Sequence, residues 1–321
     1  MVEQSRRQFI KSALMTSGAP LVMGLPWKST EKISGDKPHP VCIFSKHLQW
    51  LGFEDVGKFV KDLGFDGVDL TVRRGGHVDP ESVEKLLPEA VEKITRSGVI
   101  VPMMATNIGD AGDPLTEKVL KTASENGITH YRMDYYDYDR QKDVKTQLEQ
   151  LRGKVQHLAH LNENYRIKGA YQNHDGTHVG ASIWDIWYVL KEIDPAWTGL
   201  QFDIRHAVVE GGRSWENDLR LVHDLIHCSV VKDFIWEKNQ DNMWYVKNVP
   251  VGEGMVEFGK YFQLYKELKL SGPISLHVEY PIFNRDEENS SLAQKLKIAE
   301  RVLSADLEAV RRHLTTAGIS G

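Results

Sequence analysis

Short polar clusters follow the apolar runs of this 321-residue sequence. They contain carboxylates, imidazoles, amides and a lysine, the side-chain types that transfer protons or bind cations in enzymes. At the end of an apolar strand, such groups cost free energy unless they are paired or used. A helix cap or a loop hydrogen bond could explain any one cluster, but the whole set indicates a functional site. The clusters lie at residues 45–47, 69, 106–107, 133–137, 172–175, 203–206, 232–233 and 277–279.

These clusters must be positioned by the elements that precede them. Eight short runs rich in β-branched residues predict strands, and the segments between them have the three- and four-residue apolar spacing of helices. Helical segments at residues 53–64, 79–98 and 113–127 end on glycine, and the last two begin with Asp-Pro, which is typical of helix ends and starts. The predicted strands are residues 41–45, 67–72, 100–106, 130–135, 167–173, 199–203, 228–233 and 274–279.

This alternation predicts a single (β/α)8 barrel of the TIM type over residues 40–321. Consecutive parallel strands joined by helices leave few other topologies. An open doubly wound sheet is the alternative, but no glycine-rich phosphate-binding motif follows the first strand. In a barrel the carboxyl ends of the strands share one face, so the polar clusters would meet there. The unpatterned segment 234–254 is expected to be a loop over that mouth.

Composition excludes several classes of partner. The formal net charge of −5 and the pI near 6.2 give no long-range attraction for nucleic acid or anionic lipid. The expected partner is therefore a small molecule, and a homo-oligomer remains open. Cys42 and Cys228 lie in apolar strand-like runs, which predicts two buried thiols rather than a disulfide or a nucleophile.

The N-terminus carries the most specific local motif. The run "SRRQFIK" at residues 5–11 precedes an interrupted apolar stretch that is too short to span a bilayer. It resembles a twin-arginine export signal at every position of that pattern. We therefore expect residues 1–26 to be an export signal, residues 27–39 a linker, and the mature protein to be periplasmic without a membrane span.

Five segments together resemble one enzyme family. They are "YQNHDG", "LQFDIRHA", "VVKDF", "VPVGEGMVEF" and "LHVEYP", in this order along the chain. In order and spacing they are similar to the sugar isomerase and epimerase family with the xylose-isomerase-like barrel. The resemblance implies one divalent metal held by Glu, Asp, His and Glu of the last four strands. It also implies that the two Glu residues move a proton on either side of a carbon beside a carbonyl.

Two of the four implied metal-ligand positions are changed in this chain. The positions fall on Gln172, Asp203, Val230 and Glu279, whereas the lysine and aspartate that follow the histidine in the family pattern His-x-Lys-Asp are kept as Lys232 and Asp233. His206 takes the place of the histidine that contacts substrate. An amide oxygen can approach a hard cation, but it brings no charge and takes no proton near neutral pH. Two-base epimerisation is therefore doubtful for this chain.

Two kinds of site remain open. In the first, Gln172, Asp203 and Glu279 bind Mn, Mg or Zn with low affinity, and His277 supplies the imidazole because residues two apart on a strand face the same side. In the second there is no metal, and Glu279, His206 and Lys232 act directly, with a cationic or imidazole group polarising the carbonyl.

Three further side chains are candidates for substrate binding. His47 and His174 could contact sugar hydroxyls, and Trp236, in the segment expected over the mouth, could stack on a sugar ring. Trp184 and Trp187 have helical spacing and are expected to pack in the core.

The resulting prediction is an isomerase- or epimerase-like enzyme that abstracts a proton next to a carbonyl of a sugar or keto sugar. A lyase or hydratase acting on a 3-keto glycoside is the close alternative, because it needs one base and one acid. A sugar-binding barrel without catalysis is the alternative from another class. An abasic-site endonuclease is disfavoured, since the sequence shows neither a cluster for several zinc ions nor a basic face.

Overall fold

A computed structural model describes residues 38–320, so the predicted export signal and nearly all of the linker lie outside the described residues. The strands are β1 (Val41–Phe44), β2 (Gly67–Thr71), β3 (Ile100–Ala105), β4 (His130–Arg132), β5 (Lys168–Gln172), β6 (Thr198–Asp203), β7 (Ile226–Val231), β8 (Asp233–Lys238), β9 (Trp244–Val249) and β10 (Ile274–Leu276). The α-helices are α1 (Phe53–Leu63), α2 (Val83–Thr95), α3 (Pro114–Glu125), α4 (Val144–Tyr165), α5 (Ile183–Leu190), α6 (Ile204–Gly211), α7 (Trp215–Val222), α8 (Phe258–Glu267) and α9 (Leu292–Thr316).

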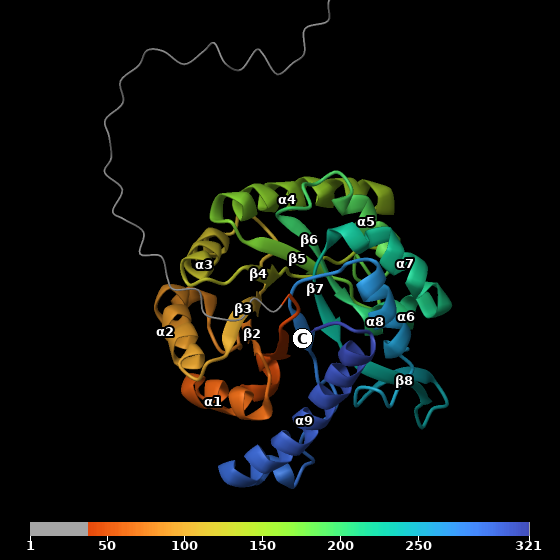
Figure 1. The fold of residues 1–321 in the computed structure, drawn as a ribbon. Helices are drawn as coiled ribbons and strands as arrows, with labels where there is room; N and C mark the ends of the chain where they lie inside the picture. The colour runs from red at the N-terminus through yellow and green to blue at the C-terminus, as the bar shows by residue number, and fades with distance from the viewer. Residues whose placement is uncertain (1–37, 321) are drawn as a thin grey trace, which may run out of the picture. The chain divides into compact units, whose positions relative to one another are not determined.

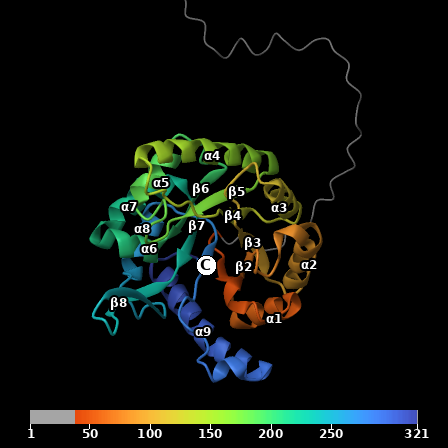
Figure 2. The ribbon, with the colours of Figure 1, turned by 180° about the vertical axis from the view of Figure 1, so that it is seen from behind.

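Eight of these strands close into a parallel barrel. Their order around it is β1, β10, β7, β6, β5, β4, β3 and β2. Figure 1 shows the helices as a ring outside the strands, and Figure 2 shows the same arrangement from behind. The predicted (β/α)8 barrel is confirmed, and the doubly wound alternative is wrong because the first and last strands pair.

The helix ends follow the local sequence signals. Asp79 and Asp113 each accept a backbone N–H two residues ahead, and a proline follows each of them. Gly64, just past α1, has a φ of 86°, the left-handed conformation that glycine adopts without strain. Both cysteines are buried and free, as expected.

Segment 234–254 is not the unpatterned loop that was expected. Its two halves contribute to an antiparallel hairpin of β8 and β9, paired from Asp233 with Val249 to Lys238 with Trp244. Figure 1 shows this hairpin outside the ring of helices, near α8. The strands were missed because much of the hairpin is exposed and lacks the apolar run of a barrel strand. Trp184 is also corrected: its side chain is 56% exposed rather than packed in the core.

Asp233 ties the base of the hairpin to the loop that follows it. Its carboxylate accepts backbone N–H groups from Phe234, Gly252, Gly254 and Val256, at 2.8 to 3.1 Å. A Cβ on Gly254 would lie 2.2 Å from the Asp233 Oδ1 atom, so the approach requires glycine. This carboxylate therefore fixes where the hairpin leaves the barrel.

We predict that Asp233→Ala lowers the free energy of unfolding by about 3 kcal/mol or more, because buried N–H groups lose a charged acceptor. Urea denaturation measures the change. Asp241→Ala, at the exposed tip of the hairpin, is the control and should stay within about 0.5 kcal/mol of wild type. Equal unfolding midpoints for the two variants would contradict the role given to Asp233.

Candidate active site

The carboxyl ends of β6, β7 and β10 converge on the ammonium group of Lys232. Its Nζ lies 2.7 Å from His206 Nε2, 3.1 Å from Asp203 Oδ2 and 3.6 Å from Glu279 Oε1. The Lys232 side chain is only 3% exposed. A buried ammonium is tolerated because carboxylates compensate its charge. The structure thus brings together the three residues that were predicted to act without a metal.

Asp203 is the buried counter-ion of this cluster. It ends β6 and caps α6, where its Oδ1 accepts the backbone N–H of His206 at 3.2 Å. Burial opposes ionisation of its carboxyl group, but His206 and Lys232 outweigh this effect and hold its pKa below the usual value. The carboxylate has no exposed surface, so it serves the cluster and does not meet solvent.

The two hydrogen-bond partners of Gln172 explain why an amide suits this position. Its Nε2 donates to Asp203 Oδ2 at 2.7 Å, and its Oε1 accepts the Tyr135 hydroxyl at 2.6 Å. A carboxylate at this position would be ionised near neutral pH and would face the Asp203 carboxylate without a proton to donate. The amide therefore satisfies Asp203 without adding a second negative charge.

Glu279 is the carboxylate of the cluster that reaches solvent, with 27% of its side chain exposed. Burial opposes its ionisation, but Lys232, assisted by Lys46 and Arg205, lowers its pKa from 4.5 to about 2. Asn248 of β9 donates to the Glu279 backbone carbonyl at 3.4 Å. The hairpin thus contributes directly to the rim around Glu279.

A second polar group lies beside the cluster. His206 Nδ1 is 2.5 Å from Asp175 Oδ1, and the His174 ring packs on the His206 ring at 4.1 Å. His174, Asp175 and His206 offer ligand atoms close enough together to hold a metal ion. Arg205 already lies there, with its Nη1 2.9 Å from Asp175 Oδ1 and 2.7 Å from His206 Nδ1.

His277 lies under the cluster rather than at its surface. The strand β10 ends one residue earlier, and the imidazole stacks on Phe44 with ring centroids 4.2 Å apart. Its Nδ1 is 3.9 Å from Glu279 Oε1, and its Nε2 is 3.8 Å from Asp69 Oδ2. Burial holds the pKa of His277 well below its ordinary value, so the ring is neutral.

Of the three candidate substrate-binding residues, His47 and His174 have contacts at the strand ends, whereas Trp236 lies on the hairpin. His47 Nε2 accepts the Val278 N–H at 2.9 Å, and burial lowers its pKa to about 4. His174 contacts the Tyr135 ring edge-on, at 4.9 Å between centroids. Trp236 is 40% exposed and lies on the same hairpin face as Phe234, two residues earlier.

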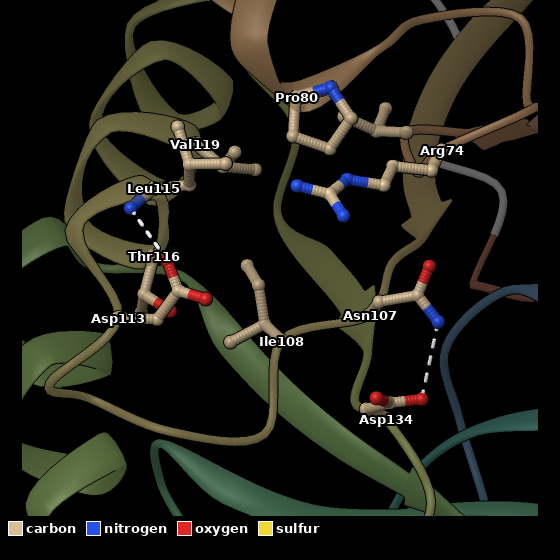
Figure 3. Close-up of a pocket in the computed structure, with 10 residues that line it drawn as sticks. Arg74, Pro80, Asn107, Ile108, Asp113, Leu115, Thr116, Val119 and Asp134 are labelled. Atoms are coloured by element: carbon tan, nitrogen blue, oxygen red, sulfur yellow. Dashed lines mark hydrogen bonds between the residues drawn. The ribbon is translucent and has the colours of Figure 1, made fainter.

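A cavity of about 280 Å³ lies at the carboxyl ends of β2, β3 and β4 (Figure 3). Asn107 Nδ2 donates to Asp134 Oδ1 at 3.1 Å within it, and Arg74 and Pro80 form another part of its wall. Asp134 precedes Tyr135, the partner of Gln172. Leu115, Thr116 and Val119 of α3 form a further wall, and none of the lining residues belongs to the Lys232 cluster.

The side chains at the metal-ligand positions do not match the donor set of a divalent cation. Val230 offers no ligand atom, and it lies between Asp203 and Ser275 in the barrel register. Both polar atoms of Gln172 are engaged, and Lys232 lies between the two remaining carboxylates. A divalent metal site requires free lone pairs and excess negative charge, and these side chains do not supply both.

A family model described as "Xylose isomerase-like TIM barrel" matches residues 58–301. The chain belongs to this family. Among curated proteins, none matches the sequence. The predicted family is confirmed by the match, which covers most of the barrel.

Solved structures with this fold include sugar epimerases. A 3-keto-D-glucoside 4-epimerase from E. coli is 11% identical, with a TM-score of 0.61 over 85% of this chain and 99% of that chain. A probable 3-DHS dehydratase from Bacillus anthracis is 13% identical, with a TM-score of 0.61 over 83% and 98%. A xylose isomerase-like protein from Mycobacterium smegmatis, in complex with magnesium, is 13% identical, with a TM-score of 0.60 over 85% and 98%. These likenesses show the fold.

Four residues of the site were not singled out from the sequence. Tyr135, Asp175, Arg205 and Asn248 contact Gln172, His206 or Glu279. Tyr135, Asp175 and Arg205 lie in the polar clusters at strand ends, so the sequence did mark the regions that contain them. Asn248 had no such signal, because it reaches the site from the hairpin.

We predict that the protein loses stability as the pH falls from about 4.5 toward 2, because Glu279 has a pKa of about 2 when folded and 4.5 in the reference state. The stabilisation is present above pH 4.5, disappears as Glu279 is protonated, and has an upper limit of about 3 kcal/mol before solvent screening. Glu279→Gln should flatten this part of the profile in urea denaturation at pH 7, 4 and 3.

Glu300→Gln, exposed on α9, should keep the wild-type slope. A Glu279→Gln profile parallel to wild type would show that Glu279 is not held in its charged form by Lys232.

Proposed function

We propose that the protein is a carbohydrate enzyme that removes a proton from the carbon next to a carbonyl of a sugar or keto sugar, with Glu279 as the base. One observation carries the proposal. Of the two carboxylates beside Lys232, Asp203 is fully buried and Glu279 is partly exposed to solvent. The family, and the sugar epimerases that share this fold, support the substrate class.

The arrangement suits formation of an enolate. A carbonyl oxygen placed beside Lys232 and His206 would receive a hydrogen bond from the ammonium as negative charge develops. Glu279 remains ionised at working pH and so can accept the proton. Its basicity is low while Lys232 is 3.6 Å away, and it rises when the substrate oxyanion shares the ammonium charge.

The amide of Gln172 favours elimination or hydration over two-base epimerisation. In a 3-keto glycoside, Glu279 would take the C2 proton, the electron pair would form the C1–C2 double bond, and the C1–O bond would break. The leaving oxygen then takes up a proton. Only one carboxylate base is needed, and the dehydratase with this fold supports such chemistry on the same scaffold.

The rim could bind the rest of a carbohydrate. His47, His174 and Trp236 supply imidazoles and an aromatic face, and the cavity with Asn107 and Asp134 has polar groups for hydroxyls.

The alternative cofactor arrangement is Mn, Mg or Zn held by Gln172, Asp203, Glu279 and His277. The alternative outside enzymology is a sugar-binding barrel without catalysis.

Proton exchange tests the reaction directly. With methyl 3-keto-β-D-glucopyranoside in D2O, NMR follows deuterium entry beside the carbonyl and release of methanol. We predict both signals for wild type and a loss of about 1000-fold for Glu279→Gln, since general base catalysis contributes 10²–10⁴-fold. Glu300→Gln is the surface control.

The outcomes separate the candidates. Exchange without methanol would favour isomerisation or epimerisation over elimination. Binding of the keto sugar with neither exchange nor methanol would favour the sugar-binding barrel and reject catalysis on this probe.

We further propose that residues 1–26 direct export to the periplasm by the twin-arginine route. No helix among residues 38–320 is long and apolar enough to cross a membrane. Changing both Arg6 and Arg7 to Lys should leave the precursor in the cytoplasm, as measured by cell fractionation. Changing Lys28 and Lys32 to Arg is the control and should not affect export. Equal export of both variants would refute the signal.

A further inference from the structure

The Lys232 ammonium lies where a cation shared by the site's carboxylates would have to lie. Its Nζ contacts Asp203 Oδ2 at 3.1 Å and is 3.6 Å from Glu279 Oε1. The third neighbour, His206 Nε2 at 2.7 Å, is also a typical metal-ligating atom. A carboxylate, a second carboxylate and an imidazole thus surround one side-chain nitrogen.

We infer that Lys232 replaces the divalent cation of this barrel, so that the cluster is complete without a metal and uses a fixed ammonium as its electrophilic group. The electrophilic part rests on the function proposed above. The replacement itself is a statement about cation binding and can be tested without any substrate.

Charge and space both support the replacement. A metal bound at the usual 2.0–2.2 Å from Asp203 and Glu279 would stand close to the ammonium, and two like charges at that distance repel strongly in a buried site. Lys232 is 3% exposed, so it has little room to swing aside into solvent.

The two altered positions fit an ammonium better than a metal. Val230 closes the barrel wall beside Asp203 without offering a donor. Gln172 gives an N–H, not a lone pair, to Asp203 Oδ2. Asp203 Oδ2 therefore accepts from both the Gln172 amide and the Lys232 ammonium, which satisfies a buried carboxylate with hydrogen-bond donors.

The neighbouring group of His174, Asp175 and His206 shows the same substitution. Arg205 Nη1 lies within 2.9 Å of Asp175 Oδ1 and 2.7 Å of His206 Nδ1. A guanidinium thus contacts two of the three atoms that could hold a metal there. Two side-chain cations, Lys232 and Arg205, thus lie at the two ring nitrogens of His206.

Metal titration of the chelator-treated protein tests the inference. Isothermal calorimetry with MnCl2 and ZnCl2, with elemental analysis of the untreated protein, should show no stoichiometric binding by wild type. Lys232→Ala removes the ammonium and leaves the Asp203, Glu279 and His206 ligand atoms facing one another. It should bind metal at least about 100-fold more tightly, since a like charge and its volume are both gone.

Lys46→Ala is the matched control. It removes one positive charge from the exposed edge of the same mouth, and its charge acts on Glu279 as the Lys232 charge does. It should bind metal no better than wild type. A gain equal to that of Lys232→Ala would mean that net charge, not occupation of the cation position, controls affinity, and would overturn the inference.

Two other results would overturn it. One is stoichiometric metal binding by the wild-type protein, whether this metal is lost in the Glu279→Gln variant or in the His174→Ala variant. The other is a folded Lys232→Ala protein that gains no affinity. If Lys232→Ala does not fold without metal, the wild-type titration decides alone. Failure of the keto-sugar exchange assay would leave all of these results unaffected.

Discussion

The site is organised by one buried charge and the groups that compensate it. Lys232 lies inside the barrel mouth, and removing its charge from water is costly unless a counter-ion is held close. Asp203 supplies that counter-ion, and its position is fixed in turn because it ends β6 and caps α6. The cluster therefore depends on the register of β6 against β7, which places Asp203 beside Val230, two residues before Lys232.

Because of this constraint, the two carboxylates beside the Lys232 ammonium have different roles. Asp203 is sealed and accepts from Gln172 and Lys232, so its hydrogen-bonding capacity is used in holding the site together. Glu279 is farther from Lys232 and open to solvent, so it keeps lone pairs for another molecule. Both have lowered pKa values for the same electrostatic reason, yet only one can reach a substrate.

The fold was predictable because its signals are local, whereas the site was predictable only in outline. Asp113 and Gly64 mark helix ends through contacts within a few residues, and the barrel strands are apolar runs. The hairpin residue Asn248 was missed because exposed strands lack such a run. The amide of Gln172 was visible in the sequence, but its role depends on Asp203, 31 residues away, and on the direction of both side chains.

The altered position Gln172 is coupled to Lys232, because both side chains contact the same oxygen of Asp203. A carboxylate at residue 172 would face Asp203 at hydrogen-bond distance, with Lys232 left to compensate an additional charge. Val230 lies beside Asp203 in the barrel register and offers no donor or acceptor of its own. Removing Lys232 alone would leave Asp203 buried with the Gln172 amide and the His206 backbone N–H as its remaining hydrogen-bond donors. Gln172 and Lys232 therefore form one arrangement around Asp203, in which an amide and an ammonium donate to the same carboxylate oxygen.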